Sequence, residues 1–356
     1  MKAFLILEDG TVFTGTSIGS TKSVISEIVF NTSMTGYLEV LTDPSYAGQA
    51  VVMTYPLIGN YGITPDMESK QPWPDGYIVR ELSRIPSNFR CQGTIQDFLK
   101  EHDIPGIAGI DTRALTKILR EKGTMNGMIT TDENYKLDEI LPQLHVYNTG
   151  NVVDKVTCSE KEVLKADGYK VALLDFGAKN NIAQSLYKRG CEVTIYPAHT
   201  TAEEILASNP DGIMLSNGPG DPKACTDIIK EVKKLYDSEV PIFAICLGHQ
   251  LMALATGADT YKLKYGHRGG NHPVKDLETG RVYISSQNHG YAVDAESLDP
   301  AVAVPAFTNV NDGTNEGLKY TGKNIFTVQF HPEACPGPQD SGYLFDKFIE
   351  MMGGQK

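Results

Sequence analysis

The run of residues 241–255 around Cys246 constrains this chain more than any other part of its sequence. The apolar residues 241–245 predict a short buried strand, and Leu251–Ala255 predict the start of a helix. The turn of four or five residues between them carries Cys246 at its tip. Such a strand-turn-helix is typical of a nucleophile elbow, whose helix points its N–H groups and positive dipole end at the sulfur and favours a thiolate. A free cysteine is also commonly an inert core residue, so this run alone leaves both interpretations open.

Length and charge limit the classes of function. The chain has 356 residues, enough for two domains with separate cores, and its composition is globular, at 41% hydrophobic and 21% charged. A net charge of −12 argues against non-specific binding to nucleic acid or an anionic membrane. No segment approaches the roughly 18 apolar residues of a membrane span. The apolar run in Met1–Gly10 is too short for a signal peptide and predicts a first strand.

The cysteines are scattered and form no CxxC pair: Cys91, Cys158, Cys191, Cys225, Cys246 and Cys335. In a chain without an export signal, this pattern favours reduced thiols and a cytoplasmic location. Outside the elbow we expect structural roles for these residues, although Cys335 lies close enough to the candidate His331 to oxidise.

The first part of the chain, 1–150, predicts a smaller α+β domain with a substantial sheet. Its expected strands include Lys2–Leu7, Ile25–Asn31 and Gln49–Tyr55, and its expected helices include Thr94–Glu101 and Thr112–Glu121. The charged, less periodic residues 151–168 predict a linker.

From Tyr169 onward, strands and helices alternate, which predicts an α/β domain over 169–356 with a doubly wound, mainly parallel sheet. The expected strands are Lys170–Asp175, Glu192–Pro197, Gly212–Ser216 and Pro241–Ile245. The expected helices are Asn181–Arg189, Thr201–Ser208, Thr226–Tyr236, His249–Thr256 and a closing helix Ser341–Met352. The region 280–330 is richer in strands and turns.

A thiol nucleophile needs a base, and the base needs a group that orients it. An apolar strand runs directly into His331, and Glu333 follows two residues later across Pro332. Catalytic groups gather at the carboxyl ends of strands in α/β sheets, so we expect His331 and Cys246 to meet there. Alone, a His-Pro-Glu sequence would indicate a surface turn. Beside a nucleophile elbow, it indicates a base and the carboxylate that orients it.

The turn after the strand Gly212–Ser216 contains Gly218 and Gly220, stiffened by prolines. Glycines let the backbone approach a ligand closely, so these N–H groups are candidates to bind an oxyanion, together with the N–H of Leu247. An ordinary strand-end turn is the alternative.

The segments 246–250, 216–222 and 331–333 resemble class I (triad) glutamine amidotransferases in order and spacing, over residues 169–353. The resemblance implies a glutaminase domain that releases ammonia from glutamine. The family often has Gly two residues before the nucleophile, where this chain has Ala244; alanine is small enough to keep the elbow competent.

Segments of the first domain, notably 30–37, 42–46, 55–61 and 109–113, together with 175–179 and 266–273, resemble the family of carbamoyl-phosphate synthase small subunits. The resemblance then covers nearly the whole chain. It implies a catalytic set of Cys246, His331 and Glu333. The glutamine-binding residues that it implies are Ser45, Gly218, Gly220, Leu247, Gln250, Asn288, Gly290 and Tyr291. The family commonly has Phe in place of Tyr291, which we expect to act through its backbone.

The resemblance also implies a partner, a large synthetase subunit that makes carbamoyl phosphate for arginine or pyrimidine biosynthesis, and it leaves a higher hetero-oligomer open. ATP, magnesium and bicarbonate are expected on that partner, and no cofactor or metal on this chain. Two alternatives stay open: a stand-alone γ-glutamyl hydrolase or peptidase of the same fold, and a docking subunit without catalysis.

Two motifs are expected to be decoys. Residues 317–324 nearly spell a phosphate-binding loop, but Asn324 replaces the hydroxyl residue and a strand follows, so a turn is expected. His267, His272 and His289 lie in glycine-rich sequence without a His-x3-His pair, which predicts loop-shaping or partner-facing roles instead of a metal site.

Overall fold

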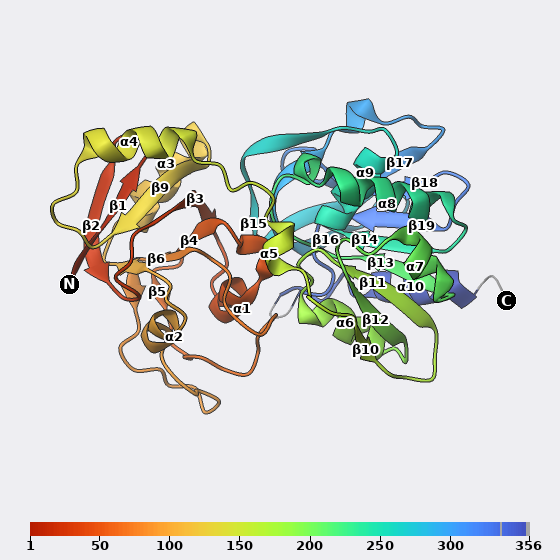
Figure 1. Cartoon of the computed structure of the whole chain (residues 1–356), viewed down its shortest axis with the longest axis horizontal. Helices are drawn as coiled ribbons and strands as arrows, with labels where there is room; N and C mark the ends of the chain where they lie inside the picture. Colours follow the sequence, from red (N-terminus) through yellow and green to blue (C-terminus); the bar gives the residue numbers. More distant parts are fainter. Residues whose placement is uncertain (335–336, 354–356) are drawn as a thin grey trace. The chain divides into compact units, whose positions relative to one another are not determined.

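The computed structural model describes residues 1–334 and 337–353, so Cys335 lies outside the described residues. The chain divides into two compact units, Met1–Thr149 and Gly150–Lys356 (Figure 1). None of the described helices is long and apolar enough to cross a membrane. The described cysteines are free thiols, as expected: Cys91, Cys158, Cys191, Cys225 and Cys246.

The first unit is built on a sheet that closes on itself, in the order β1-β2-β8-β6-β4-β3-β9. The parallel strands β3, β4, β6 and β8 are joined to the antiparallel hairpin β1–β2, and β9 closes the barrel by pairing with both β1 and β3. Closure leaves the sheet without a free edge. The α+β prediction is therefore confirmed, with the sheet closed into a barrel.

The elements of this unit follow the chain in this order: β1 (Lys2–Leu7), β2 (Val12–Ser17), β3 (Val24–Asn31), α1 (Tyr37–Thr42), β4 (Gln49–Met53), β5 (Leu57–Ile58), β6 (Gly76–Val79), β7 (Glu81–Leu82), α2 (Ile95–Glu101), β8 (Gly106–Ala108), α3 (Thr112–Lys122), β9 (Met125–Thr130) and α4 (Leu137–Val146). The Thr94 and Asp111 side chains cap α2 and α3 by accepting hydrogen bonds from backbone N–H groups three residues on.

The second unit contains, within the described residues, a ten-stranded sheet in the order β10-β12-β11-β13-β14-β19-β18-β17-β15-β16. The strands from β12 to β19 are parallel, and the strands from β19 to β16 pair in antiparallel fashion. The mainly parallel, doubly wound prediction is confirmed for the first half of this sheet, and the strand-rich region 280–330 extends it.

The elements of the second unit are α5 (Val153–Val156), β10 (Glu162–Leu164), β11 (Lys170–Asp175), α6 (Asn180–Tyr187), β12 (Glu192–Pro197), α7 (Ala202–Ala207), β13 (Gly212–Leu215), α8 (Thr226–Asp237), β14 (Ile242–Ile245), α9 (Leu247–Ala255), β15 (Thr260–Asp276), β16 (Val282–Val293), β17 (Ala303–Asn309), β18 (Asn315–Tyr320), β19 (Ile325–Val328) and α10 (Tyr343–Gly353).

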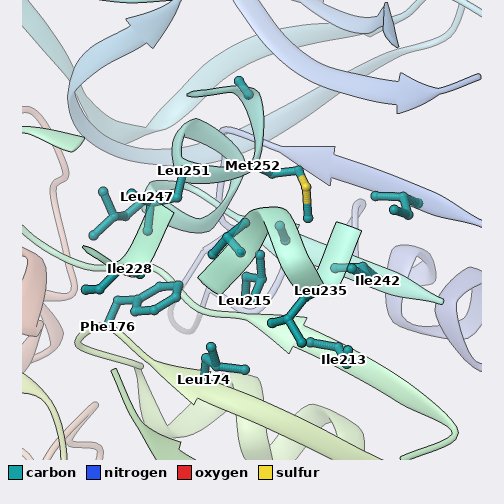
Figure 2. Close-up of a cluster of buried hydrophobic side chains, with 14 of the residues drawn as sticks. Leu174, Phe176, Ile213, Leu215, Ile228, Leu235, Ile242, Leu247, Leu251 and Met252 are labelled. Atoms are coloured by element: carbon teal, nitrogen blue, oxygen red, sulfur yellow. The ribbon is translucent and has the colours of Figure 1, made fainter. Parts of the chain in front are cut away.

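Helices cover both faces of the central strands. One buried cluster joins α7, α8 and α9 to the sheet, and Figure 2 shows part of it, including Leu215 of β13, Leu235 of α8 and Leu251 of α9. A second cluster joins α6 and α10 to the opposite face. Every residue of β13 and β14 is buried, which explains why both strands are continuous apolar runs instead of alternating ones.

The segment predicted as a linker, 151–168, is instead part of the second unit. It contains α5, whose Val153 is fully buried in the core, and β10, which pairs antiparallel with β12. The charged sequence did not predict this strand because β10 lies at the edge of the sheet with mostly exposed side chains. An edge strand needs little apolar sequence.

Candidate active site

The nucleophile elbow is tighter than the sequence predicted. β14 ends at Ile245 and α9 begins at Leu247, so Cys246 alone makes the turn instead of four or five residues. Cys246 has φ 53° and ψ −105°, a positive-φ conformation that costs a non-glycine residue on the order of 1–3 kcal/mol. Its N–H donates to the Val328 carbonyl at 2.8 Å, which ties the bend to β19. Such strain at a strand-to-helix bend is typical of a catalytic residue.

Close packing of α9 on β13 supports this bend. The N–H of Gly248 donates to the Ser216 carbonyl at 3.0 Å. A Cβ at Gly248 would lie 2.6 Å from the carbonyl oxygen of Leu215, closer than real Cβ contacts. Glycine at this position therefore lets the helix begin directly behind the nucleophile.

Ala244, the departure from the family pattern, lies fully buried in β14, beside Leu215 of β13 and Thr327 of β19. Its methyl group belongs to the same core cluster as Leu247 and Leu251. The extra methyl is thus a packed core atom behind the elbow.

His331 and Glu333 follow β19, and the structure brings their side chains together. His331 Nδ1 lies 2.7 Å from Glu333 Oε1, and both side chains are fully buried. The backbone N–H of His331 donates to the Ser286 carbonyl at 2.9 Å, which fixes the segment against β16. A carboxylate at Nδ1 fixes the ring orientation and leaves Nε2 for chemistry.

Burial lowers the pKa of His331, and the charge of Lys179 lowers it further, but Glu333 and the Cys246 side chain outweigh both and raise the pKa to about 9. Burial raises the pKa of Glu333, whereas the neighbouring His331 and Lys179 lower it to about 2. At neutral pH the pair is therefore an imidazolium beside a carboxylate. The Cys246 side chain is among the groups that raise the pKa of His331, and Nε2 of the ring makes no hydrogen bond with a described residue.

Lys179 belongs to the site and was not predicted. It precedes α6, and its Nζ lies 3.2 Å from both Glu333 Oε1 and His331 Nδ1. Nδ1 of His331 carries a proton that it donates to Glu333, so Nδ1 cannot accept a hydrogen bond from Lys179. The Lys179 ammonium therefore donates to the Glu333 carboxylate. The sequence signal was present, since Lys179 ends the segment 175–179 after a predicted strand, but no role was assigned to it.

The candidate oxyanion donors lie on adjacent segments. A Cβ at Gly218 would lie 2.2 Å from the Phe176 carbonyl oxygen and 2.8 Å from Cδ2 of Leu247. Gly220 has φ +91°, which favours glycine. The turn 218–220 therefore requires glycine at both positions, and it packs directly against the first residue of α9.

The candidate glutamine-binding residues of the second unit also surround the elbow. The Cys246 Sγ lies 3.7 Å from the carbonyl oxygen of Asn288 in β16. Gln250 Nε2 donates to the Tyr291 carbonyl at 2.8 Å and to Gln329 Oε1 at 2.9 Å. The Tyr291 carbonyl thus contacts the Gln250 side chain, and Gly290 lies between Asn288 and Tyr291 in β16. The roles of these residues in glutamine binding stay predictions from the sequence.

Ser45 lies in the first unit, in a short 3₁₀ turn, Pro44–Tyr46, where its N–H donates to Asp43 Oδ1 at 2.9 Å. Ser45 is a buried residue. Its role in glutamine binding stays a prediction from the sequence.

The predicted decoys differ in outcome. The phosphate-loop-like residues 317–324 form the end of β18 and a turn before β19, so the predicted turn occupies only the second half. The prediction that His267, His272 and His289 lie in loops is wrong. All three lie in the paired strands β15 and β16, where register shifts accommodate the glycines.

Two family models match this chain. The model for the carbamoyl-phosphate synthase small chain matches residues 5–129, and the model for class-I glutamine amidotransferases matches residues 172–351. The carbamoyl phosphate synthase small chain of Clostridium perfringens is 53% identical over 98% of this chain and 99% of its own length. The corresponding small chain of Listeria monocytogenes is 52% identical over 100% of this chain and 98% of its own length.

The chain belongs to the carbamoyl phosphate synthase small chain family. Each of its two units corresponds to one of the matched models, with the barrel in the small-chain model and the elbow in the amidotransferase model. Among solved structures, a glutamine amidotransferase of Thermotoga maritima is 18% identical over 53% of this chain and 84% of its own, with a TM-score of 0.39.

Proposed function

We propose that this small chain is the glutaminase subunit of a glutamine-dependent carbamoyl-phosphate synthase. The observation that carries the proposal is the buried set of Cys246, His331 and Glu333 at the carboxyl ends of β14 and β19. Membership of the small-chain family supports it, because the relatives match this chain from end to end.

In the proposed first step, the Cys246 thiolate attacks the side-chain amide carbon of glutamine. The N–H groups of Leu247 and of the turn 218–220 hold the oxyanion that forms. His331, protonated at neutral pH and oriented by Glu333, donates its proton to the amide nitrogen. The C–N bond breaks, ammonia leaves, and a γ-glutamyl thioester remains on Cys246.

In the proposed second step, the neutral imidazole of His331 removes a proton from water. The resulting hydroxide attacks the thioester carbon, the C–S bond breaks, and glutamate leaves with the Cys246 thiolate restored. The glutamine itself would be held by Ser45, Gln250 and the β16 residues Asn288, Gly290 and Tyr291. Tyr291 takes part through its backbone.

The released ammonia would pass to a large synthetase subunit. Free ammonia in neutral water is mostly ammonium, which is not a nucleophile, so productive use requires a sheltered path into a partner. The partner would hold ATP, magnesium and bicarbonate and make carbamoyl phosphate for arginine or pyrimidine biosynthesis.

The test is to replace Cys246 by Ser in the assembled complex and compare two nitrogen donors. Glutamine-dependent synthesis of carbamoyl phosphate should be abolished, because the serine hydroxyl does not ionise as a thiol does and is a weak nucleophile. Ammonia-dependent synthesis should persist. Survival of the glutamine-dependent reaction would contradict the proposed nucleophile. Loss of both reactions would contradict the proposed division of labour between the two chains.

The isolated chain separates the remaining alternatives. Slow glutamine turnover that a partner strongly accelerates is expected for an amidotransferase. Fast turnover without a partner would indicate a stand-alone γ-glutamyl hydrolase. Absence of labelling of Cys246 by a glutamine-like electrophile would indicate a docking subunit without catalysis.

A further inference from the structure

A second buried polar cluster lies in the antiparallel half of the large sheet. His267, His289 and Glu316 each offer a potential ligand atom, and these atoms all lie within 4.8 Å of one another. All three residues are buried, and Glu316 is fully so. They come from three strands, β15, β16 and β18, so the sheet itself brings them together. The catalytic steps proposed above use none of them.

His289 has the hydrogen-bond pattern of a metal-binding histidine. Its Nδ1 lies 2.7 Å from the Tyr291 carbonyl oxygen, which can only accept, so Nδ1 carries the proton. Nε2 is then the nitrogen with the free lone pair. This atom is buried and makes no hydrogen bond with any described residue. A backbone carbonyl that fixes the tautomer in this way is the usual partner of a histidine that binds a metal.

The tautomer of His267 is also fixed by a hydrogen bond, in this case through Nε2. Nε2 lies 2.8 Å from the Asp312 carboxylate, to which it donates. Nδ1 faces Glu316 Oε1 at 3.4 Å. Two ligand atoms bound to a tetrahedral zinc ion at about 2.1 Å lie about 3.4 Å apart, so this separation fits a shared metal ion.

Glu316 is held in place by amides that carry no charge. Asn309 Nδ2 donates to Oε1 at 2.9 Å, and Gln287 Nε2 donates to Oε2 at 2.8 Å. A buried carboxylate is costly unless a cation compensates it. A protonated His267 would be one such cation, but it would leave the lone pair of His289 Nε2 without a partner. A divalent ion between Glu316 and the two imidazoles satisfies both groups.

We propose that His267, His289 and Glu316 bind one divalent transition-metal ion of the zinc type. Two imidazoles and one carboxylate are ligands that zinc accepts, and three protein ligands leave a fourth position for water. The ion would join β15, β16 and β18 at the register shifts of the β15–β16 pair, where the ladder hydrogen bonds are interrupted. This proposal does not depend on the glutaminase function.

The ion would also stiffen the strand beside the nucleophile. His289 lies between Asn288, whose carbonyl faces the Cys246 sulfur, and the Tyr291 carbonyl that holds Gln250. Binding at His289 would therefore restrain the backbone on which the candidate glutamine-binding residues lie.

The test measures zinc binding to the full chain, stripped with a chelator, in a Cys246→Ser background so that the thiol does not compete. Titration with Zn²⁺ should show one tight site per chain. Co²⁺ at the same site should give the visible absorption of a four-coordinate ion. Glu316→Gln should weaken binding by roughly tenfold or more, and Asp312→Asn by about 10–100-fold, because outer partners of metal ligands contribute on that scale.

Two histidine variants are matched controls. His199→Asn removes an exposed histidine, and His272→Asn removes one whose ring lies 5.3 Å from that of His267 but which is outside the set. Both should leave the stoichiometry and affinity unchanged. Asp312 is half exposed, so its variant should fold, and melting midpoints verify this for all variants.

The proposal is overturned if the Cys246→Ser chain binds zinc no more tightly than through scattered surface sites. It is equally overturned if Glu316→Gln and Asp312→Asn bind as the parent does. In that case His267 and Glu316 form a charged hydrogen-bonded pair without a metal ion.

Discussion

Lys179 Nζ lies 3.2 Å from Glu333 Oε1. It thus joins the buried pair of His331 and Glu333, which the sequence analysis predicted without a lysine. Glu333 raises the pKa of His331, whereas Lys179 lowers it. The two charges thus act in opposite directions on the same imidazole. Their removal should shift the pH dependence of glutamine hydrolysis in opposite directions, which gives two linked predictions.

Glu333→Gln should move the alkaline limb of the pH profile to lower pH. With Glu333 present, the pKa of His331 is raised to about 9, so the imidazolium persists below that pH and is lost above it. Without the carboxylate charge, the pKa should fall by about 1–3 units. The measurement is kcat/KM for glutamine against pH in the assembled complex. Glu296→Gln, at an exposed site, is the control and should leave the limb in place.

Lys179→Met should move the same limb upward, by about one unit, because the ammonium that opposes the imidazolium is removed. The same kcat/KM profile measures it, and Lys188→Met removes an exposed lysine after the same helix as a control. A downward shift, as for Glu333→Gln, would show that Lys179 acts mainly by keeping Glu333 ionised.

Gly248→Ala should damage the elbow without touching a reacting group. The new Cβ would lie 2.6 Å from the Leu215 carbonyl oxygen, so α9 must move away from β13. Overpacking of this kind costs about 1–3 kcal/mol of stability. A displacement of about 1 Å at a catalytic group can reduce the rate by about 10²-fold. Glutamine turnover and the denaturation midpoint should both fall, whereas Gly93→Ala, which meets no atom within 4 Å, should change neither.

Phe243→Ala should destabilise the second unit. Phe243 precedes the elbow in β14, is fully buried, and stacks on Phe326 with ring centroids 4.4 Å apart. Truncation of a buried phenylalanine costs about 3–5 kcal/mol. Denaturant unfolding followed by circular dichroism measures the loss. Phe89→Ala, at a side chain that is 95% exposed, should stay within about 0.5 kcal/mol of the parent.

The sequence could predict the features that depend on local pattern. The apolar strand before Cys246, the helix after it and the His331–Glu333 spacing lie within short windows, where periodicity indicates the elements directly. The parallel half of the sheet followed from the alternation of strands and helices for the same reason. Helix starts were approximate by one or two residues, since α9 begins at Leu247 and not at His249.

The remaining features depend on contacts between residues that are far apart in the sequence, which local patterns do not predict. Lys179 reaches His331 across 152 positions of sequence, because the chain segment after β11 lies near the end of β19. The barrel of the first unit closes only because β9 returns to pair with β1, and β10 is an edge strand that no apolar pattern revealed. His267, His289 and Glu316 are separated in sequence and meet because β15, β16 and β18 belong to one sheet. Sequence patterns determine which elements form, whereas which of their side chains share a site depends on strand order and register, which are settled when the sheet assembles.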